Sequence, residues 1–128
     1  NGLASPTVSY CVVSPEGELV SEQWFDAPYC ALMHDFAITS EHAIFTVYPT
    51  KADLARLKQG GPHWIHDQND HCWIGVMPRY GKVEELVWFR GPVGVHSYHV
   101  MNAFTDGTKV HIDQCMAVTN LIPFITRD

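Results

Sequence analysis

The sequence lacks any long apolar run. A membrane-spanning helix needs about 18 or more consecutive apolar residues, and even the apolar segment 118–125 is interrupted by Asn120 and Pro123. Basic residues are also few, with 8 lysines and arginines against 14 acids and a net charge of −6 when the histidines are neutral. Phosphate backbones are bound by basic surfaces. We therefore expect neither a membrane span nor a nucleic-acid partner.

Paired cysteines are also missing. The four cysteines are far apart and form no CxxC pair, so a zinc site built on cysteine is not expected. They are Cys11, Cys30, Cys72 and Cys115. This pattern favours reduced, mostly buried thiols and a cytoplasmic protein, although the sequence leaves a disulfide open. The chain also has no initial methionine and no basic-then-apolar leader, which suggests processing or a piece of a longer protein.

What is present indicates a single β-rich globular unit. The chain is 46% apolar and 17% charged over 128 residues, which is typical of one folded domain, residues 1–128. Strand-like runs come in four pairs separated by turn residues, the strongest turn being Asp106-Gly107. The predicted pairs are 7–13 with 18–25, 36–39 with 43–48, 72–77 with 85–89, and 98–104 with 109–118. The fold class expected is all-β, with four hairpins.

One short helix is expected between the second and third hairpins. Thr50 to Asp53 has the spacing of a capping box, Leu54 and Leu57 share a face, and Gly60-Gly61-Pro62 ends the helix. The strand 43–48 is apolar on both faces. A strand buried on both sides fits between the radially packed sheets of a propeller better than in a sandwich. The pattern leans mildly toward a propeller.

Histidine is abundant, and neutral imidazole is the commonest metal ligand in proteins. The eight histidines are His34, His42, His63, His66, His71, His96, His99 and His111. The pairs His63/His66 and His96/His99 are three residues apart, which puts the two rings on opposite faces of a strand. No HExxH motif occurs. His34 and His99 each enter an apolar strand, and the residues alone favour two core histidines over two ligands.

The sequence around these two histidines resembles the carotenoid cleavage oxygenase family. The stretches 28–39 and 98–104 look like that family's signatures around two iron-binding histidines, and 75–79 and 87–89 match in order between them. The finer match is to the bacterial lignostilbene dioxygenase branch, through 60–64, 88–92, 102–108 and 120–124. Many family members carry a glutamate where Thr105 stands, which weakens the case for a plant or animal carotenoid substrate.

The resemblance implies an internal piece of a seven-bladed β-propeller with ferrous iron, Fe(2+), on its axis. It assigns His34 and His99 as two of four histidine ligands, and the other two as lying outside this stretch. It implies dioxygen and an electron-rich alkene, a stilbene or apocarotenoid, as reactants, and two carbonyl compounds as products. His63 and Trp64 are expected to line the substrate route, and His96 to be a cavity-lip or structural residue.

The length of the chain limits this interpretation. About eight strands make roughly two four-stranded blades, so we expect open edges, self-association and no activity by this chain alone. Two alternatives stay open. One is a small β module that binds an apolar or aromatic ligand without catalysis, and the other is a zinc protein using His63, His66 and His71.

Overall fold

The computed structural model describes residues 4–120, 122 and 125–127. It contains eleven strands, one α-helix and one 3-10 helix. The strands are β1 (Thr7–Val13), β2 (Leu19–Asp26), β3 (Phe36–Ile38), β4 (His42–Val47), β5 (Thr50–Lys51), β6 (Ile65–His66), β7 (His71–Pro78), β8 (Val87–Val93), β9 (Val100–Asp106), β10 (Lys109–Gln114) and β11 (Thr126–Arg127). The helices are α1 (Leu54–Lys58) and η1 (Val83–Glu85). No helix in the described ranges is long and apolar enough to cross a membrane.

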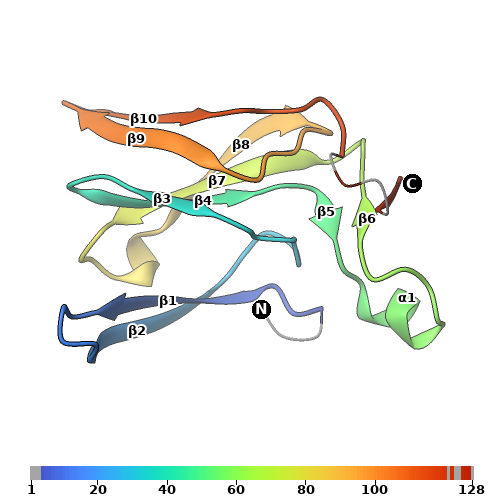
Figure 1. Cartoon of the computed structure of the whole chain (residues 1–128), viewed down its shortest axis with the longest axis horizontal. Coiled ribbons are helices and arrows are strands. Elements are labelled where there is room, and N and C mark those ends of the chain that lie inside the picture. The colour runs from blue at the N-terminus through green and yellow to red at the C-terminus, as the bar shows by residue number, and fades with distance from the viewer. Residues whose placement is uncertain (1–3, 121, 123–124, 128) are drawn as a thin grey trace.

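Three layers of antiparallel strands lie one above another (Figure 1). The middle layer is a four-stranded sheet in the order β3-β4-β7-β8. The β1-β2 hairpin lies on one side of this sheet and the β9-β10 hairpin on the other. The four predicted hairpins and the all-β propeller class are confirmed. Their grouping is one complete four-stranded blade flanked by two hairpins.

The strand β4 is buried along nearly its whole length because it has a layer on each side. Ala43 and Phe45 pack with Tyr10 of β1 and Met77 of β7. Ile44 on the opposite face is fully buried as well. The sequence prediction that this strand is covered on both faces is therefore confirmed.

The chain leaves the sheet between its two central strands. The segment from β5 to β6, with α1 at its tip, connects β4 to β7, which pair directly with each other. The short strands β5, β6 and β11 form a separate three-stranded sheet at this end. The sequence did not predict these strands, because two-residue strands have no detectable alternation.

The helix begins later than its sequence pattern suggested. Asp53 is the N-cap, and its carboxylate accepts from the Arg56 N–H at 2.7 Å. Thr50 lies in β5, and its hydroxyl faces two buried histidines. The predicted capping box at Thr50 is therefore wrong. The aspartate was available three residues before Arg56 and satisfied the helix terminus instead.

Only half of the four cysteines are buried. Cys30 and Cys72 are buried, whereas Cys11 and Cys115 are exposed on β1 and beyond β10. The expectation of mostly buried thiols is thus wrong for two positions. The motif 120–124 lies largely outside the described residues.

Candidate metal centre

The structure brings His34 and His99 together. Each residue lies just before a strand, His34 before β3 and His99 before β9. Their ring centroids are 5.2 Å apart with an interplanar angle of 58°. Both side chains are exposed in this chain. Two imidazoles that are far apart in the sequence therefore lie next to each other and are exposed, at the same end of the layers that contain β3 and β9.

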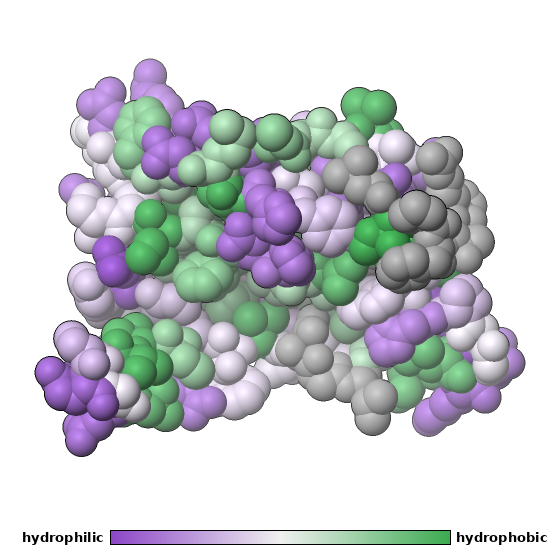
Figure 2. All heavy atoms as spheres, viewed as in Figure 1, coloured by the Kyte–Doolittle hydropathy of each residue, from purple (hydrophilic) through white to green (hydrophobic). Residues whose placement is uncertain are grey.

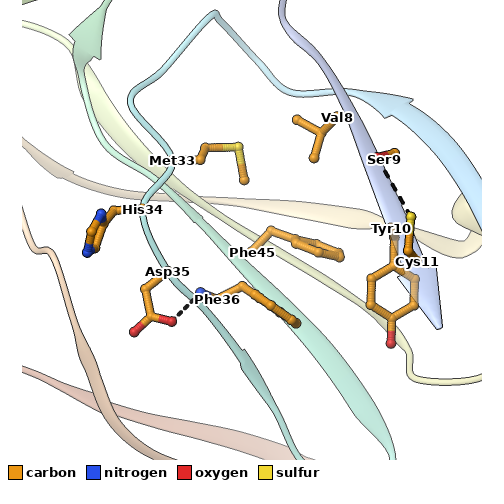
Figure 3. Close-up of a pocket in the computed structure, with 9 residues that line it drawn as sticks. All are labelled: Val8, Ser9, Tyr10, Cys11, Met33, His34, Asp35, Phe36 and Phe45. Atoms are coloured by element: carbon orange, nitrogen blue, oxygen red, sulfur yellow. Dashed lines mark hydrogen bonds between the residues drawn. The ribbon is translucent and has the colours of Figure 1, made fainter. Parts of the chain in front are cut away.

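One carboxylate ties the two histidine-bearing segments to each other. Asp35 Oδ2 accepts a hydrogen bond from the Val100 N–H at 2.8 Å, and its Oδ1 accepts from the Phe36 N–H at 2.9 Å. Asp35 follows His34, and Val100 follows His99, so this link sets the spacing of the two rings. Figure 3 shows Asp35 and His34 as neighbours at the entry to β3. Sequence reasoning missed this role, because only its position beside His34 hinted at it.

A second polar contact holds the far ends of β3 and β9 together. The Thr39 hydroxyl lies 2.9 Å from the Thr105 hydroxyl, which in turn lies 3.2 Å from His42 Nδ1. Thr105 is the position where the sequence departs from the glutamate of many carotenoid oxygenases. Here it joins two layers, so this chain uses a neutral hydroxyl for a structural contact at that place.

The ring nitrogens of His34 and His99 have no hydrogen-bond partner among the described residues, in contrast to the rings that are fixed by the fold. His66, His71, His42 and His96 each direct Nδ1 at a carbonyl or a hydroxyl. A neutral imidazole with a free lone pair is a metal ligand. The pair therefore fits a shared metal ion in part. No group of three or more metal-ligating side chains occurs in the described part of the chain.

His34 also borders an apolar pocket. This pocket has a volume of about 330 Å³ and lies between β1 and the segment that leads into β3. Met33, Phe36 and Phe45 supply apolar surface, and Asp35 and Tyr10 add polar groups at its edges (Figure 3). An apolar or aromatic molecule would find complementary surface beside the candidate metal pair.

His96 lies in the core. Its side chain is fully buried, with Nδ1 3.1 Å from the Thr50 hydroxyl. Burial lowers the pKa of His96 to about 4, with smaller contributions from His66 and His34. Burial on this scale supports the structural role that was one of the two expected for His96, and it gives the residue no place on an open cavity lip in this chain.

His63 and Trp64 lie in the loop between α1 and β6. Their rings pack together with centroids 4.7 Å apart. Neither ring contacts His34 or His99 among the described ring pairs. Their predicted place on a substrate route stays a prediction.

The alternative zinc site is contradicted. Both nitrogens of the buried His66 are engaged, Nδ1 by the Thr50 hydroxyl at 3.0 Å and Nε2 by the Gly94 carbonyl at 3.0 Å. His71 Nδ1 lies 2.7 Å from the Gly91 carbonyl oxygen. His66 therefore has no lone pair to share with His63 and His71, and no group of three metal-ligating side chains occurs in the described residues.

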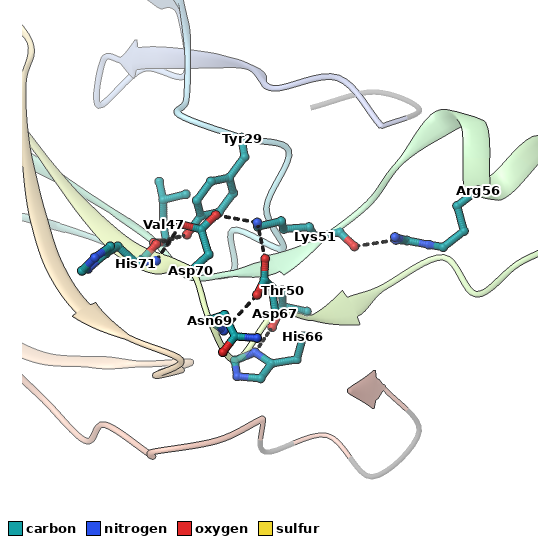
Figure 4. A network of polar contacts seen from close by, with 10 residues as sticks. All are labelled: Tyr29, Val47, Thr50, Lys51, Arg56, His66, Asp67, Asn69, Asp70 and His71. Atoms are coloured by element: carbon teal, nitrogen blue, oxygen red, sulfur yellow. Dashed lines mark hydrogen bonds and ion pairs between the residues drawn. The ribbon is translucent and has the colours of Figure 1, made fainter. Parts of the chain in front are cut away.

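A second polar cluster surrounds Lys51 and is satisfied internally (Figure 4). Lys51 Nζ pairs with Asp67 at 2.8 Å and with Asp70, and it lies 4.9 Å above the Tyr29 ring centroid. The Tyr29 hydroxyl donates to the His71 carbonyl at 2.8 Å. Burial, followed by the nearby Asp70 carboxylate, raises the pKa of Tyr29, so this phenol stays neutral. The cluster fastens β5 to the base of β7 and is not a second candidate centre.

Comparison with known proteins gives a consistent result along the whole chain. The family model for retinal pigment epithelial membrane protein matches residues 1–128. A lignostilbene-alpha,beta-dioxygenase isozyme III of Sphingomonas paucimobilis is 39% identical over 96% of this chain and 26% of the relative. An isoeugenol monooxygenase of Pseudomonas nitroreducens is 37% identical over 96% of this chain and 25% of the relative. The chain spans about a quarter of the length of these curated relatives.

Solved structures agree with these relatives. The lignostilbene dioxygenase of Pseudomonas brassicacearum superimposes with a TM-score of 0.92 at 36% identity, over 98% of this chain and 26% of that one. The cobalt-substituted Synechocystis ACO superimposes with a TM-score of 0.73 at 26% identity, over 89% of this chain and 24% of that one. The arrangement of the layers is therefore that of these solved oxygenase structures.

Proposed function

We propose, because the chain belongs to the retinal pigment epithelial membrane protein or carotenoid cleavage oxygenase family, that it is part of a non-heme iron dioxygenase. The proposed reaction adds both atoms of dioxygen across a carbon–carbon double bond and yields two carbonyl compounds. The substrate class is a stilbene or apocarotenoid. The relatives' names include lignostilbene dioxygenase and isoeugenol monooxygenase, which favours an aryl alkene over a carotenoid.

The observation that carries this proposal is the pairing of His34 and His99. The two rings lie 5.2 Å apart with no hydrogen-bond partner among the described residues. They would hold Fe(2+) as two neutral ligands, so the charge of the ion would not be cancelled. Bound iron would supply the activation of dioxygen. Asp35 would maintain the spacing of the two ligands through its hydrogen bond to the Val100 N–H.

The apolar pocket beside His34 would receive the substrate. Phe36, Phe45 and Met33 would contact an aromatic ring there, and the exposed side of His34 would face the double bond. The phenol of Tyr10 donates to the Arg79 carbonyl at 3.1 Å, so it stays neutral and structural. We propose no turnover by this chain alone, because two imidazoles hold ferrous iron weakly.

Metal binding tests the proposal directly. Fe(2+) is titrated into the tag-free chain under nitrogen and followed by calorimetry, with His34→Ala, His99→Ala and His63→Ala as variants. His63 is an exposed histidine whose ring nitrogens have no hydrogen-bond partner among the described residues, so it is the matched control. We expect each of the first two changes to weaken binding at least about tenfold, or 1.4 kcal/mol, and the third to leave it unchanged. Iron binding that is unchanged in both His34→Ala and His99→Ala would refute the assignment of these residues as ligands.

A binding module without catalysis is the second candidate, and a separate hollow favours it. This hollow has a volume of about 490 Å³ and lies between the middle sheet and β10, against Ile74, Val76 and Phe89. Its size is within the range of small-molecule sites. Saturable binding of a hydroxystilbene that survives both His34→Ala and His99→Ala would support this function over the first.

A further inference from the structure

A buried chain of hydrogen bonds ends beside the candidate metal pair. The side chains of Thr50, His66 and His96 are all fully buried. The Thr50 hydroxyl lies 3.0 Å from His66 Nδ1 and 3.1 Å from His96 Nδ1. Thr50 and His66 lie on the paired strands β5 and β6 (Figure 4), and His96 comes from the segment between β8 and β9. Three parts of the chain therefore converge on one hydroxyl.

The positions of the protons follow from the end of this chain of bonds. His66 Nε2 faces the Gly94 carbonyl at 3.0 Å, and a carbonyl only accepts, so Nε2 carries the proton. A neutral imidazole has one N–H, so His66 Nδ1 accepts from the Thr50 hydroxyl. The Thr50 oxygen then accepts from the Nδ1–H of His96. Charged rings are disfavoured here because no carboxylate bonds to either imidazole among the described residues.

This order leaves His96 Nε2 as a lone pair. The atom is buried and has no partner in the described part of the chain, and the same holds for the Tyr98 hydroxyl. The His96 and Tyr98 rings are in contact, with centroids 4.5 Å apart. A phenol donates and this lone pair accepts, so the two unpaired groups are chemically complementary. Leaving a buried polar group unpaired costs about 1–3 kcal/mol, and a single buried water is a common bridge.

Tyr98 stands between His96 and the candidate ligands. Its ring meets His34 edge-on, with centroids 5.3 Å apart and an interplanar angle of 84°. It also lies 6.4 Å from the His99 ring. An interaction that fixes the Tyr98 ring therefore also fixes the surface against which the His34 ring packs.

We propose that the Tyr98 hydroxyl donates to His96 Nε2 through one buried water, and that this link makes both residues positioning residues for the His34 and His99 rings. The Thr50-His66 chain holds His96 in the tautomer that can accept. Neither residue is a ligand in this scheme. The positioning role rests on the proposed function, whereas the hydrogen-bond link does not.

Nuclear magnetic resonance of the metal-free, nitrogen-15-histidine-labelled chain tests the link. We expect His96 to carry its proton on Nδ1 and His66 on Nε2. Tyr98→Phe should shift the His96 Nε2 resonance toward that of a free lone pair and leave His66 in place. Tyr10→Phe is the matched control, because it removes a tyrosine hydroxyl bonded elsewhere. A proton on His96 Nε2, or a Nε2 resonance indifferent to Tyr98→Phe, would overturn the proposal.

The positioning role has its own readouts. The Overhauser contact between the His34 and Tyr98 rings should be lost in His96→Asn, whose amide can still donate to Thr50 but is too short to place an acceptor where Nε2 lies. In the Fe(2+) titration, Tyr98→Phe should weaken binding about tenfold, as loss of a supporting hydrogen bond does at metal sites. If the chain binds no iron, the two histidines do not form a metal site within this chain alone, while the ring contact still decides the positioning role. An unchanged ring contact in His96→Asn would refute that role.

Discussion

The histidines of this chain differ by what their ring nitrogens meet. His66 and His96 are buried and fixed by the Thr50 hydroxyl, whereas His34 and His99 are exposed and their ring nitrogens have no hydrogen-bond partner among the described residues. A side chain that the fold has already satisfied contributes to stability. A side chain that the fold holds in place but leaves unsatisfied is available to a ligand. The same residue type therefore serves two purposes within a few ångströms.

The buried His96 should make the chain sensitive to acid. Its pKa is lowered to about 4 by burial, below the value near 6.5 of an unfolded histidine. The unfolded chain therefore takes up a proton between these pH values while the folded chain does not, and the free energy of unfolding falls as pH drops through that window. The loss is at most about 3 kcal/mol. Urea unfolding between pH 7 and pH 4 measures it.

His96→Gln should flatten this pH dependence, although it lowers stability at neutral pH. His63→Gln, which changes an exposed histidine, should leave the acid dependence as it is in the unmodified chain. An equally steep loss of stability in both variants would assign the acid sensitivity to other groups.

Part of the candidate centre was predictable from the sequence, and part was not. The motifs around His34 and His99 were enough to single out both residues, because each motif is local. Asp35 and Tyr98 were not singled out, because their roles depend on contacts with Val100 and His96 that only the folded layers create. The tautomer of His96 likewise depends on three segments that no local pattern connects.

Among the elements, the pairing of β7 with β8 depends on a glycine. Gly75 lies opposite Trp88, and a Cβ added at Gly75 would lie 2.7 Å from the indole ring. Trp88 in turn packs on the cluster of Tyr10, Phe45 and Met77. The absence of a side chain at Gly75 thus lets the indole lie flat over the strand.

Gly75→Ala should destabilise the chain by about 1–3 kcal/mol, because the new methyl group displaces Trp88 from its packing. Thermal unfolding and the tryptophan emission of the chain both report this change. In a Trp88→Phe background the smaller ring leaves room, so the same substitution should cost clearly less. Equal costs in the two backgrounds would mean that the indole is not the obstacle.

Element boundaries show where local patterns mislead. The hairpin strands were predicted within a few residues because their alternation and turn residues are local. The predicted helix start was wrong, since Thr50 and Asp53 are both good N-caps but the Thr50 hydroxyl is bonded to His66 and His96. A tertiary contact therefore determined where the helix begins.

The whole molecule is a stack of layers, and the edge strands of its sheets are unpaired on one side in the described chain. β8 pairs only with β7, and its Val87 and Phe89 are more than half exposed. Figure 2 shows apolar side chains reaching the surface in each of the three layers. Open strand edges with apolar side chains pair with other chains.

We expect this chain to self-associate with rising concentration. Val87→Lys should reduce association, because a charge on an edge strand opposes pairing with another strand. Val118→Lys is the control, since Val118 is 90% exposed but belongs to no strand. Sedimentation velocity over a range of concentrations distinguishes the two. Equal effects of both changes would point to general surface hydrophobicity instead of the edge.

The excursion that carries α1 divides the middle sheet into two halves. β4 and β7 are joined by six registered residue pairs, yet the chain between them travels out to Gly60, whose φ of +76° marks an exposed turn at the tip. A single cut after Gly60 would break no strand and would leave β3-β4 on one piece and β7-β8 on the other. The chain could therefore be divided into two complementary fragments at this turn. Its two pieces, 1–60 and 61–128, would reassemble by pairing β4 with β7 and β5 with β6, and that reassembly would bring His34 and His99 together from separate polypeptides.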